Sequence, residues 1–111
     1  GLLLRQGRSS VIFTSDTGPT SRIWDVANTT EDLAAIITEV SFPNRMQDVA
    51  DVSLHLTPNT LSAELKKLKR DVPVYLYHFK PPYIDELREE LAAAELRVPV
   101  EELVQDRLYR F

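Results

Sequence analysis

The segment at residues 11–20 (VIFTSDTGPT) constrains the possible fold most. Four residues that suit a buried strand run directly into a polar loop that contains Asp16, Gly18 and Pro19, and a helical pattern follows the loop. This order places Asp16 at the carboxyl end of a strand, where open α/β sheets bind their ligands. The same aspartate could instead form the turn or cap the following helix.

Strand-like and helix-like segments alternate along the chain. Buried and β-branched residues predict strands at residues 2–6, 10–14, 35–40, 72–78 and 98–104. The first two should form a hairpin, and residues 108–111 should close a second hairpin. Apolar spacing predicts a helix that starts at Thr20 or Ser21 and ends near residues 28–30, helices at 44–52, 59–70 and 83–96, and one helical turn at 31–34. This alternation favours an α/β arrangement with some parallel strand pairing.

Individual residues predict where helices start and which sides they bury. Thr57 is a natural N-cap, and Pro58 suits the first helical position. The inward side of the helix that follows should consist of Leu61, Leu65 and Leu68. The apolar side of the helix at residues 44–52 should consist of Met46, Val49 and Ala50.

The composition indicates one small globular domain or a piece of a larger one. The chain has 111 residues, of which 43% are hydrophobic and 27% charged. The net charge is −4 and the basic residues are scattered, so we see no electrostatic footprint for nucleic acid. No apolar run approaches the roughly 20 residues that cross a bilayer. Because no signal peptide is visible either, we expect no membrane partner and a cytoplasmic location.

The chain enters its first predicted strand at residue 2 and does not begin with methionine. Domains rarely begin inside their own sheet. We therefore expect residues 1–111 to be a single segment cut from a larger domain.

Four ionisable side chains follow predicted strands or precede predicted helices, namely Asp16, Glu39, His55 and His78. Strand ends in an α/β sheet can share one edge, so these four groups could converge on one cleft. Because the chain has no cysteine, any metal must use histidine and carboxylate ligands. A catalytic metal usually needs three protein ligands, and each histidine could instead be a structural residue.

Four short motifs occur in a recognisable order: SDTGPT at residues 15–20, EVSFPN at 39–44, HLTP at 55–58 and HFKP at 78–81. With these motifs the chain resembles the C-terminal half of a metallo-β-lactamase-fold hydrolase over essentially its whole length. It most resembles the class II cyclic-nucleotide phosphodiesterases, and more distantly the tRNA 3′-processing endonucleases. The resemblance implies half of an αββα sandwich, with a mixed sheet and helices on one face. It also implies metal-dependent hydrolysis of a small-molecule phosphodiester.

The resemblance implies a role for each motif residue. Asp16 would bridge two divalent metal ions (zinc, or else manganese or iron), and His78 would be the last histidine ligand of one of them. His55 would lie near the scissile phosphate as the general acid, oriented by Glu39. The phosphate pocket would be lined by Thr17, Thr57 and Lys80. Ser15 stands where the family has glycine, which would tighten the turn before Asp16.

The main metal signature of that family, His-x-His-x-Asp-His, belongs to its N-terminal half and does not occur in this sequence. We therefore expect little metal affinity and no turnover from these residues alone. The complementary half would be cut away, or supplied by another chain or a second copy, or the chain would be a degenerate half-domain. Two alternatives stay open: a non-catalytic α/β module that binds a partner through the same loops, and a structural half-domain that assembles through its sheet edge and core face.

Overall fold

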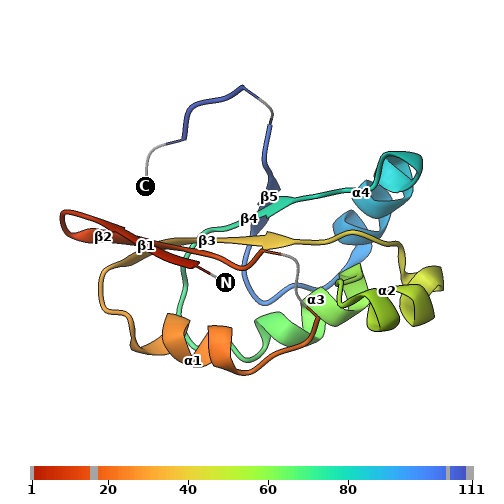
Figure 1. The fold of residues 1–111 in the computed structure, drawn as a ribbon. Coiled ribbons are helices and arrows are strands. Elements are labelled where there is room, and N and C mark those ends of the chain that lie inside the picture. Colours follow the sequence, from red (N-terminus) through yellow and green to blue (C-terminus); the bar gives the residue numbers. More distant parts are fainter. Residues whose placement is uncertain (1, 16–17, 105, 110–111) are drawn as a thin grey trace.

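The computed structural model describes residues 2–15, 18–104 and 106–109 (Figure 1). Five strands form one mixed sheet in the order β1-β2-β3-β4-β5. The strands are β1 (Leu2–Gln6), β2 (Ser9–Phe13), β3 (Leu33–Glu39), β4 (Val74–Tyr77) and β5 (Val100–Glu102). The helices are α1 (Arg22–Thr29), α2 (Gln47–Ser53), α3 (Pro58–Leu65) and α4 (Ile84–Ala93), and the 3-10 turns η1 (Asn44–Met46) and η2 (Pro81–Tyr83) precede α2 and α4. The predicted α/β class and the mixed sheet are confirmed.

Strand direction changes once across the sheet. β1 and β2 form the predicted antiparallel hairpin, with Leu2 opposite Phe13. Gly7 takes a φ of 60° in the turn between them, a conformation that glycine adopts without steric cost. The other neighbouring strands, β2 with β3, β3 with β4 and β4 with β5, pair in parallel. These parallel strands therefore end at one edge of the sheet, and the loops that follow them meet there.

One face of the sheet packs against α1 and α3, which lie together on that side in Figure 1. Apolar side chains alternate along the strands so that every second one points toward these helices. The buried core includes Ile12, Ile36, Val74 and Leu76 from the strands and Trp24, Ala27, Leu61, Leu65 and Leu87 from the helices. Burying one leucine stabilises a fold by about 1.5–3 kcal/mol. This layer therefore holds the strands, and with them their carboxyl ends, in fixed positions.

The opposite face of the sheet carries half-buried aromatic side chains. The rings of Phe13 and Tyr77 lie 4.8 Å apart between centroids, and Tyr75 packs edge-on against Tyr109 of the C-terminal segment at 5.5 Å. The hairpin register places Leu2 on the same face as its partner Phe13, and Leu2 is 57% exposed. This face is therefore less completely covered than the helical one.

Two predicted helical segments differ in the structure. Residues 33–34 belong to β3 instead of a helical turn, because Leu33 is buried and pairs with β2. α3 ends at Leu65, well before residue 70. The side chain of Asn28 donates to the carbonyl of Lys67 at 2.9 Å and accepts from the N–H of Lys69 at 2.7 Å. These bonds occupy two backbone groups that a longer helix would need.

The predicted closing hairpin also differs. β5 covers only Val100–Glu102 and pairs in parallel with β4. Residues 106–109 contain no strand, and residues 110–111 lie outside the described part of the chain. The N–H of Val104 donates to the hydroxyl of Tyr109 at 2.9 Å, and the N–H of Arg107 donates to the carbonyl of Val104 at 3.2 Å. These local bonds fold the segment back on itself, so it does not pair as a strand.

The predicted helix start at residue 57 is confirmed. The Thr57 hydroxyl accepts from the N–H of Thr60, and the Thr60 hydroxyl accepts from the N–H of Thr57, so the two residues form a capping box. The apolar side predicted for residues 44–52 is wrong in part. Val49 is 45% exposed, and the residue that α2 buries is Ala50.

Among the described helices, none has the length and apolar character needed to cross a membrane.

Candidate functional site

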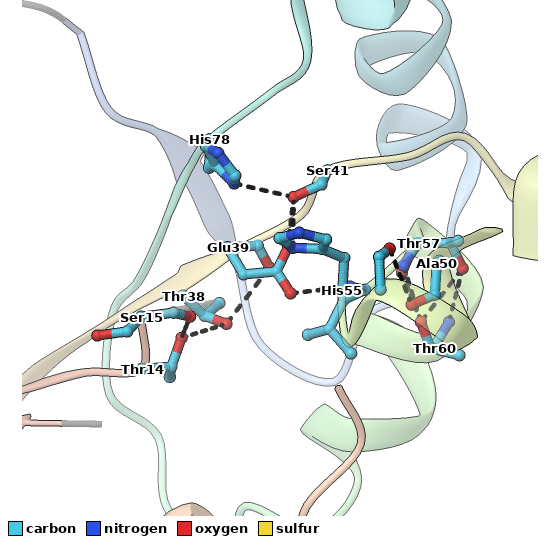
Figure 2. A network of polar contacts seen from close by, with 12 residues as sticks. Thr14, Ser15, Thr38, Glu39, Ser41, Ala50, His55, Thr57, Thr60 and His78 are labelled. Atoms are coloured by element: carbon cyan, nitrogen blue, oxygen red, sulfur yellow. Dashed lines mark hydrogen bonds and ion pairs between the residues drawn. The ribbon is translucent and has the colours of Figure 1, made fainter. Parts of the chain in front are cut away.

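Three segments meet at the carboxyl edge of the parallel strands. Glu39 ends β3, His55 follows α2 by two residues, and His78 follows β4 directly. One ligand atom from each of these side chains lies within 4.8 Å of the others, and Figure 2 shows the three groups facing one another. The structure thus brings together three of the four ionisable residues that the sequence singled out. The fourth, Asp16, and the neighbouring Thr17 lie outside the described residues.

Glu39 is completely buried and accepts hydrogen bonds through both carboxylate oxygens. Its Oε1 accepts from the backbone N–H of Leu56 at 2.8 Å, and its Oε2 accepts from the hydroxyl of Ser41 at 2.7 Å. The same Oε2 lies 3.5 Å from Nδ1 of the buried His55. A buried carboxylate is costly unless its oxygens are satisfied, so these contacts fix its position.

Ser41 lies at the centre of the cluster. Its buried hydroxyl oxygen is 3.2 Å from Nδ1 of His55 and 3.1 Å from Nδ1 of His78, in addition to the 2.7 Å contact with Glu39 (Figure 2). The sequence analysis did not select this residue. The available signal was its spacing from Glu39, because residues i and i+2 of an extended segment point to the same side.

Left-handed backbone conformations surround the cluster. Among the described residues, non-glycine residues with positive φ are Ser15 (58°), Leu54 (59°), His78 (71°) and Asp106 (65°). The first follows β2, the second precedes His55, and the third is itself a member of the cluster. Such conformations cost about 1–3 kcal/mol each and gather at functional sites, where the surrounding structure enforces them. Their distribution therefore supports a functional role for this edge of the sheet.

The loop after β2 reaches the segment that carries His55. A side-chain carbon built on Gly18 would lie 3.5 Å from the Cα of Leu54. Further back in the same segment, the hydroxyl of Thr14 lies 3.2 Å from the hydroxyl of Thr38, next to Glu39. Thr14 and Gly18 therefore both lie close to segments that carry residues of the cluster.

The two other predicted phosphate-pocket residues lie in different surroundings. Thr57 is completely buried, and its hydroxyl donates to Oε1 of Gln47 at 2.7 Å while it caps α3. Lys80 places its ammonium 5.7 Å from the ring centroid of Phe42, a cation–π distance. Phe42 in turn packs edge-on against His55 at 5.8 Å. Lys80 therefore holds a positive charge near the cluster, whereas Thr57 serves the helix start.

A cavity of about 650 Å³ opens beside His78. Its walls include the rings of Tyr77, Phe79 and Tyr109 and the side chains of Arg88 and Arg107. This volume lies within the usual range for small-molecule sites. A hydrogen bond and charge attraction from Glu102 raise the pKa of Arg88, so this guanidinium stays charged.

The donor set of the cluster fits a divalent metal ion. Two imidazoles and one carboxylate are ligands that zinc and manganese accept. In tetrahedral zinc geometry, bonds of about 2.0–2.1 Å place two ligand atoms about 3.4 Å apart. The ligand atoms here lie within 4.8 Å of one another, so side-chain rotations would have to bring them closer before they could share one ion. The exposed position of His78 allows such a rotation.

No protein-family model matches the chain, and no curated protein matches it either. The resemblance described above therefore depends on the four motifs and their order.

Proposed function

We propose that this chain forms part of the active site of a metal-dependent phosphodiester hydrolase similar to the cyclic-nucleotide phosphodiesterases. The observation that carries the proposal is the convergence of Glu39, His55 and His78 at the carboxyl edge of the sheet. Hydrolysis of a phosphodiester needs a site for a cation and a proton donor for the departing oxygen. This cluster contains side chains suited to both tasks.

The surroundings of the two histidines favour different roles. His78 is exposed and borders the cavity, so it is the better placed ligand for a cation. A divalent cation held there would lower the pKa of a water molecule and stabilise negative charge on the phosphoryl oxygens. His55 is buried with Nδ1 facing Glu39 and Ser41, so these two contacts would hold the ring in place. In this proposal His55 delivers a proton to the departing oxygen, and Asp16 supplies the bridging carboxylate that the resemblance implies.

The charge near the cluster supports a phosphodiester as the substrate. Lys80 lies on the ring of Phe42, next to His55, where its ammonium would attract a phosphate oxygen. The cavity beside His78 has room for the organic group on the other side of the phosphate.

The test uses the complete protein encoded by the gene, loaded with zinc or manganese. We expect hydrolysis of bis-p-nitrophenyl phosphate and of 3′,5′-cyclic nucleotides, and we expect the upstream coding sequence to contain a His-x-His-x-Asp-His segment. Treatment with a chelator should abolish the activity, and added metal should restore it. A complete protein with no such segment and no hydrolysis would refute the proposal.

A second candidate function is assembly with another protein or a second copy. The observation that favours it is the edge strand β1, in which Leu2 and Leu4 are each 57% exposed. An exposed apolar edge strand offers unpaired backbone groups to another chain. In this case the polar cluster would serve the fold alone.

A further inference from the structure

We propose that Ser41 is a positioning residue whose single hydroxyl holds both His55 and His78 in the tautomer with the proton on Nδ1. Both rings then carry the lone pair on Nε2. The tautomer assignment comes from contacts within the chain, whereas the identity of the group that Nε2 binds depends on the function proposed above.

The assignment follows from the number of protons available. A serine hydroxyl has one proton to donate and two lone pairs with which to accept. Three polar atoms surround the oxygen of Ser41, namely Oε2 of Glu39 at 2.7 Å and Nδ1 of each histidine at 3.1–3.2 Å. The carboxylate is the closest and the strongest acceptor, so it takes the hydroxyl proton. Each imidazole can then bond to Ser41 only by donating from Nδ1.

The other contacts of Glu39 agree with this direction. Its Oε1 already accepts from the N–H of Leu56, so the carboxylate acts as an acceptor at both oxygens. If the hydroxyl proton pointed at a histidine instead, two oxygen lone pairs would face each other at 2.7 Å. That arrangement is repulsive in a buried site.

In this assignment both histidines donate from Nδ1 to Ser41. Nδ1 of His55 also lies 3.5 Å from the Glu39 carboxylate. Replacement of Ser41 removes the oxygen that both rings share, so the population of the Nδ1-protonated tautomer should fall. Because an imidazole binds a metal through the nitrogen that carries the lone pair, Ser41 would present Nε2 of His78 to a cation. Nε2 of His55 would then be the nitrogen that faces the departing oxygen.

The experiment is a long-range proton–nitrogen NMR correlation of the two imidazole rings in the metal-free chain, at a pH where both rings are neutral. We expect the Nδ1-protonated pattern for both rings in the wild type and in Ser41→Thr, which keeps a hydroxyl. In Ser41→Ala we expect at least one of the two rings to move toward the Nε2-protonated pattern. An Nε2-protonated ring in the wild type, or two unchanged rings in Ser41→Ala, would overturn the inference.

Ser10→Ala is the matched control. Ser10 is also fully buried, and its hydroxyl also donates to a carboxylate at 2.7 Å, that of Asp32. Its removal should leave both imidazole patterns unchanged. A zinc titration of the same substitutions in the complete protein separates this inference from the proposed function. Zinc should bind about 10–100-fold more weakly to Ser41→Ala than to the wild type or to Ser10→Ala. If the wild-type tautomers are as expected but no zinc binds, the proposed function fails and the role of Ser41 stands.

Discussion

The carboxylate of Glu39 accepts a hydrogen bond from the backbone N–H of Leu56 at 2.8 Å, across 17 residues of sequence. This bond ties the end of β3 to the segment that carries His55, and Leu56 itself is buried in the core. The position of the imidazole is therefore set by a carboxylate that belongs to a different element. A buried hydrogen bond of this kind serves the stability of the fold and the geometry of the site together.

Replacement of Glu39 by alanine should lower the free energy of unfolding by about 3 kcal/mol, because the N–H of Leu56 and the hydroxyl of Ser41 lose their buried acceptor. Glu39→Gln keeps one acceptor oxygen, so this substitution should lower the free energy of unfolding by about half as much. Urea unfolding measures both values. The control is Glu102→Ala, which removes an exposed ion pair with Arg88 and should cost less than about 1 kcal/mol. Equal losses in Glu39→Ala and the control would contradict the buried role of Glu39.

Substitutions of the residues proposed to bind metal and to donate the proton should separate loss of metal from loss of turnover in the complete protein. Asp16→Ala and His78→Ala should abolish metal retention and activity, whereas His55→Ala should lower turnover with the metal retained. Metal analysis after gel filtration and steady-state kinetics measure the two quantities. Asp71→Ala is the control, because the side chain of Asp71 is 92% exposed and lies in a surface ion pair with Arg97. Equal loss of metal in all three site variants would rule out this division of roles.

Leu54 ends α2 in a left-handed conformation, with φ of 59° and ψ of 51°, and its residue surface is 64% exposed. Leu54→Gly should therefore raise the free energy of unfolding by about 1 kcal/mol, because glycine adopts this conformation without the steric cost. Val52→Gly is the matched comparison inside α2 and should lower stability by about 0.3–0.5 kcal/mol. Thermal unfolding of both variants measures whether their stabilities change in these opposite directions. A destabilised Leu54→Gly would mean that contacts of the leucine outweigh its backbone strain.

Glu64 links α3 to the segment before α1. This buried carboxylate accepts from the N–H of Thr20 at 2.6 Å and from Nε1 of Trp24 at 3.1 Å. Glu64→Ala should lower the free energy of unfolding by about 2–3 kcal/mol, since it leaves buried donors without their charged acceptor. Fluorescence of Trp24, the single tryptophan of the chain, follows the unfolding and should also report the change around the indole. Glu31→Ala on the surface should leave both signals unchanged.

The assembly candidate predicts that the chain associates through β1. In that case Leu4→Lys should weaken self-association at least about tenfold, equivalent to about 1.4 kcal/mol, because a charge would be placed in the apolar contact. Sedimentation velocity over a range of concentrations measures the association constant. Val52→Lys changes an equally apolar residue on α2, 87% exposed, and should have no effect. A monomeric wild type at all concentrations would exclude this candidate for a second copy.

Local patterns in the sequence were sufficient for much of the fold. The hairpin of β1 and β2, the cap at Thr57 and the inward leucines of α3 depend on residues close together in the chain. Their conformations follow from turn chemistry and apolar period, so the alternation of strands and helices could be predicted. The same local signals placed Glu39, His55 and His78 at the ends of elements. Their meeting at one sheet edge follows from the parallel order of the strands.

Contacts between distant residues decided the remaining features. Asn28 ends α3 by bonding to residues about forty positions away, and β5 pairs with β4 after the intervening helix α4. Ser41 joins two histidines that are 14 and 37 residues further along the chain. The sequence by itself therefore determined the elements and the types of side chain at their ends. Only the tertiary structure decided which of those side chains share a hydrogen bond, because bond geometry depends on the packing of whole elements and not on spacing along the chain.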